Sequence, residues 1–150
     1  MIDAVVDLME VQLNDRILHL GFGDGAVTRK LARLAVNGVV LGVDVSDNLV
    51  WQARKLLADI ENVMFVPGSP EEIPWQEDFF SAVLSTTPPW PDPPRAAREI
   101  HRVTAPGGRL LAFDLTAGAA PSLAAAGFEA VEVRQTAAGL LLAARKPKMG

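Results

Sequence analysis

The chain has 150 residues, of which 49% are hydrophobic and 21% charged, with a formal net charge of -4 and a pI near 5.1. This size predicts a single domain over residues 1–150. The absence of cysteine excludes disulfides, thiolate zinc sites and cysteine nucleophiles. An acidic balance without a basic stripe argues against general nucleic-acid binding. No apolar run reaches the roughly 18 residues that cross a membrane, and the start lacks a signal-peptide pattern, so we expect a cytoplasmic protein.

The first half of the chain alternates between helical spacing of apolar residues and short β-rich runs. A helix is expected at 2–11, followed by a buried strand at 16–20 that ends at a glycine. A second helix at 25–36 precedes the continuous apolar run 38–43, which is typical of a strand covered on both faces. A helix that extends to about residue 60 follows. This alternation predicts an α/β fold built around a mostly parallel sheet.

Prolines interrupt the middle of the chain in two places. A third strand is expected at 62–66 and a fourth at 79–85. Between them, residues 67–75 contain three prolines and one glycine, so we expect a loop with at most one helical turn. Residues 86–94 contain five prolines, which argue against regular structure there.

The last third of the chain predicts three more strands. A helix at 95–104 should close at an Ala-Pro-Gly-Gly turn, before a strand at 109–114. A helix at 120–126 then leads to strands at 128–135 and 139–146. The interval between these last two strands is too short for a parallel crossover, which needs roughly a dozen residues. We therefore expect the sheet to end in an antiparallel hairpin.

A glycine-rich loop joins the first strand to the second helix. Gly21, Gly23 and Gly25 lie in the stretch Gly-Phe-Gly-Asp-Gly, where glycines permit a sharp turn and the close approach of a ligand to the backbone. Such loops cradle nucleotides. The same glycines also suit a strand-to-helix turn with a purely structural role, so the loop alone leaves both interpretations open.

An acidic residue, Asp44, ends the second strand. In nucleotide-binding α/β folds, an acid in this place accepts the ribose hydroxyls. The alternative is that Asp44 only caps the next helix. Because Ser46 and Asp47 already offer capping groups, the sequence favours ligand contact by Asp44.

Several stretches, in this order, resemble the motifs of class I S-adenosylmethionine-dependent methyltransferases, most closely the small-molecule enzymes of the ubiquinone/menaquinone-biosynthesis type. They are residues 17–25, 42–46, 66–75, 98–103, 106–108, 126–128 and 143–147. The resemblance implies a three-layer Rossmann-like fold with a seven-stranded, mostly parallel sheet and a C-terminal antiparallel hairpin. It also implies S-adenosyl-L-methionine as cofactor and a small molecule as substrate. The cofactor-binding positions that it implies are His19, Gly21, Gly23, Gly25, Asp44 and Ser69.

The chain departs from the family pattern at three polar positions and at one backbone N–H. His19 stands where the family usually has an acid that helps to hold the methionine end of the cofactor. Ser69 stands where the family has an Asp that accepts a hydrogen bond from the adenine amino group, and Pro70 lacks the N–H that the family directs at adenine. Ser81 replaces a further common Asp. The resemblance therefore predicts weakened cofactor binding, with His19 as a replacement ligand that faces the pocket.

The stretch from Thr87 to Trp90 reads Thr-Pro-Pro-Trp. It is similar to the Asn/Asp-Pro-Pro-aromatic motif of methyltransferases that act on amino groups, which implies that Thr87 and Trp90 face the substrate. A proline-rich loop with one half-buried tryptophan explains the same residues. His101, inside the helix before the Pro-Gly-Gly turn, fits a structural role better than that of a catalytic base.

Two other functional classes remain open. A nicotinamide-dependent oxidoreductase shares the glycine loop, but the C-terminal part predicts a hairpin in place of a substrate domain. A non-catalytic scaffold or partner-binding module would explain the altered cofactor positions. We expect no metal site, and we expect a second copy or a partner subunit as a possible contributor to an otherwise open site.

Overall fold

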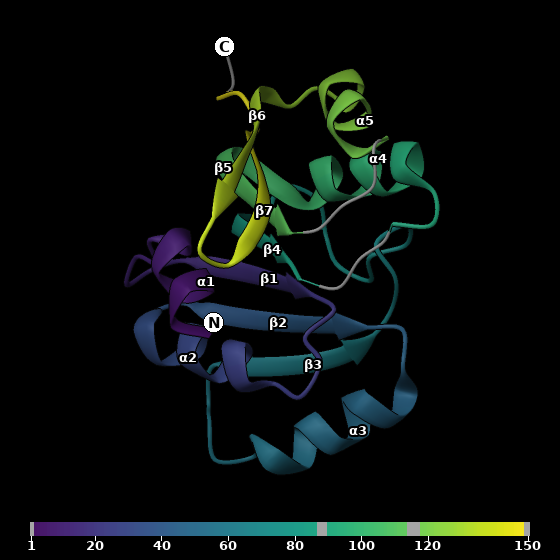
Figure 1. Cartoon of the computed structure of the whole chain (residues 1–150). Helices are drawn as coiled ribbons and strands as arrows, with labels where there is room; N and C mark the ends of the chain where they lie inside the picture. Colours follow the sequence, from purple (N-terminus) through teal and green to yellow (C-terminus); the bar gives the residue numbers. More distant parts are fainter. Residues whose placement is uncertain (1, 87–89, 114–117, 149–150) are drawn as a thin grey trace.

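The computed structural model describes residues 2–86, 90–113 and 118–148 (Figure 1). Its strands are β1 (Arg16–Leu20), β2 (Val39–Asp44), β3 (Val63–Pro67), β4 (Phe80–Ser85), β5 (Thr104–Phe113), β6 (Glu129–Thr136) and β7 (Gly139–Arg145). Its helices are α1 (Ile2–Met9), α2 (Ala26–Leu34), α3 (Asp47–Leu56), α4 (Pro93–Val103) and α5 (Ala119–Ala126). Helices and strands thus alternate along the chain, except where β4 follows β3 and β7 follows β6 directly, as the hydrophobic pattern predicts.

All the strands form one 7-stranded sheet with the order β3-β2-β1-β4-β5-β7-β6. Strands β1 to β5 pair in parallel, whereas β7 is antiparallel to both β5 and β6 (Figure 1). The predicted mostly parallel sheet and terminal hairpin are confirmed. The chain builds outward from β1 in one direction and from β4 in the other, so these neighbours form the switch point at whose carboxyl ends such sheets bind ligands.

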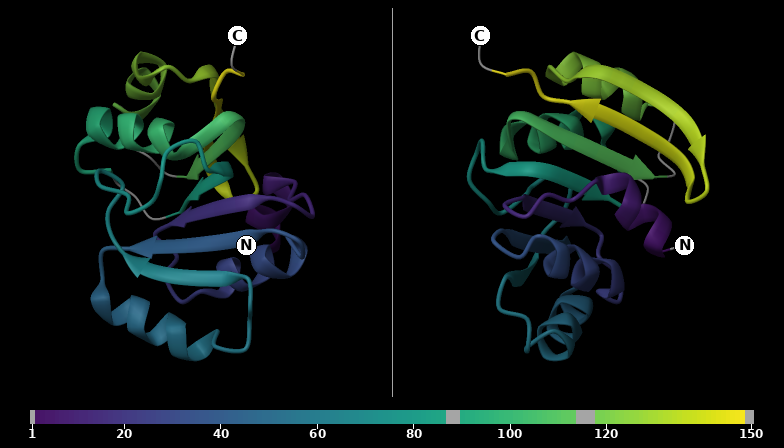
Figure 2. Two further views of the ribbon diagram at one scale, coloured as in Figure 1. Left: turned by 180° about the vertical axis from the view of Figure 1, so that it is seen from behind. Right: turned by 90° about the vertical axis from the view of Figure 1, so that its left-hand side faces the viewer.

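Helices cover both faces of the sheet, as Figure 2 shows. Successive side chains of β1 enter opposite layers. Ile17 packs with residues of α1 and α2, and Leu18 packs with residues of α4 and α5. Helix α3 packs against Phe65 of β3 through Val50 and Ala53, and Leu57, which follows the helix, joins the same cluster. Burial of both faces explains why the central strands are continuous apolar runs.

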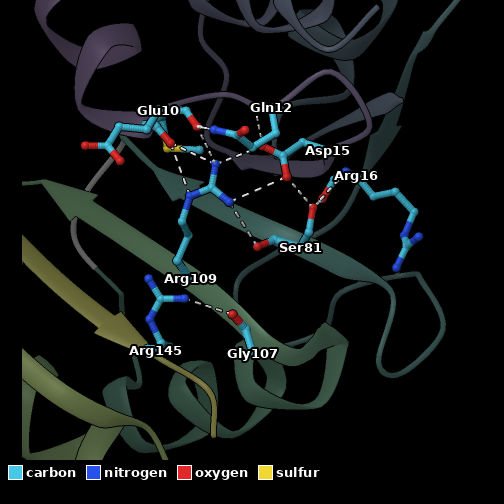
Figure 3. A network of polar contacts seen from close by, with 9 residues as sticks. Glu10, Gln12, Asp15, Arg16, Ser81, Gly107, Arg109 and Arg145 are labelled. Atoms are coloured by element: carbon cyan, nitrogen blue, oxygen red, sulfur yellow. Dashed lines mark hydrogen bonds and ion pairs between the residues drawn. The ribbon is translucent and has the colours of Figure 1, made fainter. Parts of the chain in front are cut away.

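A polar network anchors α1 at the amino ends of the strands (Figure 3). Arg109 donates to the backbone carbonyl of Met9 at 2.8 Å and forms an ion pair with Asp15 at 2.8 Å. Ser81 donates to Asp15 at 2.8 Å and accepts from the backbone N–H of Arg16 at 2.9 Å. Ser81, one of the departures from the family pattern, therefore has partners at the amino ends of the strands, away from the carboxyl ends where such sheets bind ligands.

Several element boundaries differ from the sequence prediction: α1 ends at Met9 and α3 at Leu56, both earlier than expected, while α4 and β5 begin earlier than expected. Helix α4 begins at Pro93, because proline is tolerated in the first helical turn and Asp92 caps the helix by accepting from the N–H of Arg95 at 3.2 Å. Strand β5 begins at Thr104, which pairs with Phe80 before a bulge. The Pro-Gly-Gly segment, expected to be a turn, is thus an irregular part of the strand.

Candidate cofactor site

A pocket of about 380 Å³ opens at the carboxyl ends of β1, β2 and β3. Its volume falls within the roughly 300–1,000 Å³ of small-molecule sites. The described lining residues come from the glycine loop, the ends of β1 and β2, the turn after β3, the start of α3 and the residue that precedes Asp92. They are Leu20, Gly21, Gly23, Val43, Asp44, Val45, Leu49, Gly68, Ser69, Pro70, Glu71 and Pro91.

The three glycines of the loop all have positive φ, at 71° for Gly21, 63° for Gly23 and 85° for Gly25. A Cβ added to Gly23 would meet no atom within 4 Å, whereas one on Gly25 would lie 3.2 Å from Leu57 Cδ1. Gly21 and Gly23 line the pocket, while Gly25 is the N-cap of α2. The structure therefore brings two of the three predicted glycines to the pocket and gives the third a role in packing.

Asp44 lies in the pocket wall and is 9% exposed. Its Oδ1 accepts from the backbone N–H of Ser46 at 3.1 Å, which leaves Oδ2 as the oxygen that can accept from a ligand hydroxyl. Ser46 itself caps α3, because its Oγ accepts from the N–H of Leu49 at 3.2 Å. Capping is therefore done by Ser46, and Asp44 does not serve as the helix cap.

Ser69 and Pro70 line the same pocket in a tight turn after β3. The N–H of Glu72 donates to the Ser69 carbonyl at 3.1 Å, and the N–H of Ser69 donates to the Glu72 carbonyl at 3.4 Å. The N–H of Gly68 donates to the Asp44 carbonyl at 3.0 Å, which holds this turn beside the end of β2. Pro70 offers no N–H to a ligand, so the turn presents one hydroxyl where the family presents a carboxylate and an amide.

His19 lies behind the glycine loop, on the side of α2, and is 1% exposed. Its Nδ1 is 2.9 Å from the hydroxyl of Thr28, and its Nε2 is 2.8 Å from the hydroxyl of Thr86. Burial lowers the pKa of His19 to about 3. His19 is absent from the described lining of the pocket, so in this structure the expected replacement ligand contacts protein groups.

Trp90 is buried, at 2% exposed, in the core layer beneath α4 and α5. Its indole N–H donates to Ser85 Oγ at 3.1 Å. The family resemblance implies a substrate-facing ring, and the alternative interpretation is a half-buried loop tryptophan. The structure places the ring within the core, more deeply buried than the alternative expects. Thr87, the other expected substrate-facing residue, lies outside the described residues.

The pocket has an acidic character in the part of the chain that the structure describes. Its charged lining residues are Asp44 and Glu71, and the described lining contains no Lys or Arg. Glu71 accepts from the backbone N–H of Asp92 at 3.2 Å, which ties the turn after β3 to the cap of α4. A ligand with a positive centre suits such a wall better than one with several phosphates.

Three residues in or behind the pocket are not indicated by any strong sequence signal. Thr28, Thr86 and Glu71 belong to no motif that identifies them individually. Thr86 directly follows a predicted strand, and Thr28 lies in the first turn of the helix after the glycine loop. Their positions at the same end of neighbouring elements are the signal that could have found them.

The described residues form neither a metal-binding cluster nor a membrane-spanning helix. Over residues 2–86, 90–113 and 118–148, no group of three or more His, Cys, Asp or Glu side chains could hold a metal ion. Within the same ranges, no helix has both the length and the apolar character required to cross a membrane.

The sequence that forms this pocket matches a known protein family. Residues 17–108 match the family described as methyltransferase domain. The ubiquinone/menaquinone biosynthesis C-methyltransferase UbiE of Proteus mirabilis is 32% identical over 121 residues, covering 74% of this chain and 47% of that protein. UbiE of Vibrio parahaemolyticus is 31% identical over 121 residues, covering 74% of this chain and 45% of that protein. The chain therefore spans about half the length of these curated relatives.

Solved structures share the whole fold at low sequence identity. The (4+2) cyclase SpnF has a TM-score of 0.83 at 21% identity, covering 99% of this chain and 80% of that chain. A SAM-dependent methyltransferase from Aquifex aeolicus has a TM-score of 0.81 at 18% identity, covering 95% and 89%. A chain solved in the complex of the Haloferax volcanii Trm112 methyltransferase activator with a methyltransferase has a TM-score of 0.83 at 19% identity, covering 97% and 88%.

These likenesses to solved structures establish the fold alone, because proteins that share a fold can catalyse different reactions. The family match covers β1 to the start of β5 and includes the glycine loop, Asp44 and the turn after β3. Sequence and geometry thus agree on the same end of the same sheet. The chain belongs to the methyltransferase domain family.

Proposed function

We propose that the chain binds S-adenosylmethionine in the pocket at the ends of β1, β2 and β3, and that it serves methyl transfer to a small molecule. The observation that carries this proposal is the meeting of Gly21 and Gly23 with the carboxylate of Asp44 in one pocket of about 380 Å³. Bound S-adenosylmethionine supplies an electrophilic methyl group attached to a sulfonium centre.

The residues present fit the nucleoside part of such a cofactor. Asp44 Oδ2 can accept from ribose hydroxyls, and the open space beside Gly23 admits a ligand close to the backbone. Leu49 and Val45 provide apolar surface at the same wall. The carboxylates of Asp44 and Glu71 favour a ligand with a net positive charge, which supports S-adenosylmethionine over a nicotinamide dinucleotide.

A methyl acceptor of the quinone-precursor type is supported by the UbiE relatives, which are named C-methyltransferases. The chain spans about half the length of those relatives, and the acceptor proposed for it is a small organic molecule. A second copy or a partner subunit is a proposed contributor to the open side of the site. The Haloferax volcanii chain solved with a Trm112 activator supports that idea by analogy.

The second candidate is a non-catalytic domain that keeps the fold as a scaffold. It is favoured by one specific feature, the turn at Ser69 and Pro70, which lacks both the carboxylate and the N–H expected to recognise adenine. His19 adds to this, since its ring is turned toward Thr28 and Thr86. This candidate predicts that S-adenosyl compounds do not bind.

Calorimetric titration with S-adenosylhomocysteine separates the two candidates. The variant Asp44→Asn keeps the shape of the side chain but loses the charge, and the loss of a charge-assisted hydrogen bond of about 1.5–3 kcal/mol predicts roughly 10- to 100-fold weaker binding. Asp47→Ala is the matched control, because Asp47 is an exposed acid three residues further on that does not line the pocket.

Micromolar binding by the wild-type protein and by Asp47→Ala, with a large loss in Asp44→Asn, supports the proposal. The absence of binding to the wild-type protein would favour the scaffold. Preferential binding of a nicotinamide dinucleotide in the same experiment would contradict both.

A further inference from the structure

His19 connects three elements that meet behind the pocket. It lies in β1, one residue before the strand's end, and its ring is in hydrogen-bond contact with Thr28 of α2 and with Thr86, which follows β4. Thr86 in turn donates from Oγ1 to the carbonyl of Gly21 at 2.9 Å. Gly21 lines the pocket, so this set of contacts ends on the pocket wall.

The direction of each hydrogen bond follows from the groups involved. The Gly21 carbonyl can only accept, so the single hydroxyl proton of Thr86 is directed toward it. The oxygen of Thr86 must then accept from Nε2–H of His19, and the unprotonated Nδ1 accepts from the hydroxyl of Thr28. The four groups form one relay in which every proton has one acceptor, and it requires a neutral imidazole protonated at Nε2.

We infer that His19 and Thr86 are positioning residues, whose relay from Thr28 to the Gly21 carbonyl holds the glycine loop in the geometry that receives the cofactor. This inference rests on the proposed function, because it assigns the relay to the same pocket. His19 thus stabilises the shape of the site through Thr86, at the position where the family has an acid.

The relay ends at a glycine, whose backbone has more conformational freedom than that of any other residue. Gly21 has no side chain and a φ of 71°, so its peptide groups have more accessible orientations than those of other residues. A hydrogen bond that fixes the carbonyl before binding removes an ordering cost from the binding step. Loss of the Thr86 hydroxyl is therefore expected to weaken ligand binding although Thr86 is absent from the described lining of the pocket.

A role in stability alone is the alternative, and the chain offers a matched control for it. Thr104 is 0% exposed and donates from Oγ1 to the Ile100 carbonyl at 2.6 Å. It lies at the start of β5, at the end of the sheet opposite the pocket. Replacing either threonine by valine removes a hydroxyl that bonds a backbone carbonyl and keeps the branched shape.

The first experiment measures S-adenosylhomocysteine affinity and the urea unfolding midpoint for Thr86→Val, Thr86→Ser and Thr104→Val. We expect Thr86→Val to raise Kd roughly 5- to 20-fold, and Thr86→Ser to stay within about twofold of the wild-type protein because it keeps the hydroxyl. Thr104→Val should lower the midpoint and leave Kd unchanged. Equal losses of stability in the two valine variants with unchanged Kd would overturn the positioning role.

The second experiment reads the relay without any ligand. The chain has 2 histidines, so nitrogen-15 NMR of the imidazole rings needs only the variant His101→Gln to assign His19. We expect His19 as the neutral Nε2–H tautomer, unchanged between about pH 8 and pH 5. The Nδ1–H tautomer, or titration of His19 near its ordinary pKa of about 6.5, would overturn the relay.

The two readouts keep the failures distinguishable. If the wild-type protein binds S-adenosylhomocysteine but Thr86→Val binds equally well, the positioning role alone fails. If the wild-type protein does not bind while His19 shows the expected tautomer, the proposed function fails, and the positioning role fails with it.

Discussion

The imidazole of His19 has both ring nitrogens in contact with threonine hydroxyls and almost no contact with solvent. Burial lowers the pKa of His19 from 6.5 to about 3 in the folded protein, whereas the unfolded chain keeps the ordinary value. Below about pH 6.5 the unfolded state therefore binds a proton that the folded state does not. The contribution of His19 to stability is fully present above that pH and is lost as the pH falls toward 3.

This residue predicts a specific pH dependence of unfolding. Between about pH 7.5 and pH 4.5, the free energy of unfolding of the wild-type protein should fall by about 2 to 3 kcal/mol more than that of His19→Gln, which has no titrating ring. Urea unfolding of both proteins at the two pH values measures the difference. Parallel loss of stability in both proteins would show that His19 is protonated in the folded state.

At the scale of single side chains, the sequence predicts which residues lie near the site better than it predicts where they point. Leu18 and His19 are neighbours on β1 and enter opposite layers, but both faces of this strand are buried, so the apolar pattern does not say which face is which. Trp90 follows a proline-rich stretch that suggests a loop side chain, yet its ring packs under α4 and α5. Only tertiary packing decides these directions.

For the elements, apolar patterning together with stop and turn signals predicts each helix and strand, and local chemistry moves the ends. The start of α4 was hidden by Pro93 and Pro94, which a helix accepts in its first turn when Asp92 caps it. The start of β5 was hidden by Gly107, which has a φ of 81° and still donates to the Lys146 carbonyl at 2.9 Å. In both cases the residue type that usually ends an element is accommodated inside it.

The loop between β1 and α2 yields a prediction that separates two glycines. In either position alanine is strained by about 1–2 kcal/mol, because φ is positive. Gly25→Ala also brings a Cβ against Leu57 and should lose more stability than Gly23→Ala, with S-adenosylhomocysteine affinity near that of the wild-type protein. Gly23→Ala places its methyl group in the open pocket and should lose roughly tenfold or more in affinity.

Urea unfolding and calorimetry on the two alanine variants measure these effects. A larger loss of affinity in Gly25→Ala than in Gly23→Ala would reverse the assignment of the two glycines to packing and to the pocket.

Across the molecule, the amino and carboxyl ends of the strands carry different sets of polar groups. The amino ends of β1, β4 and β5 carry the network of Asp15, Ser81 and Arg109 that fixes α1 (Figure 3). The carboxyl ends carry the glycine loop, Asp44 and the turn after β3. Parallel strands place these groups together although they lie far apart in the sequence, so residues from three separate motifs line one pocket.

The most direct measurement is a titration of S-adenosylhomocysteine followed in the backbone amide NMR spectrum of the wild-type protein. We predict that the largest shifts fall on Gly21, Gly23, Asp44, Val45 and the turn at Ser69, while the amides around Asp15 and Arg109 stay in place. A spectrum that does not change, or changes confined to the opposite end of the sheet, would contradict the assignment of this pocket to the cofactor.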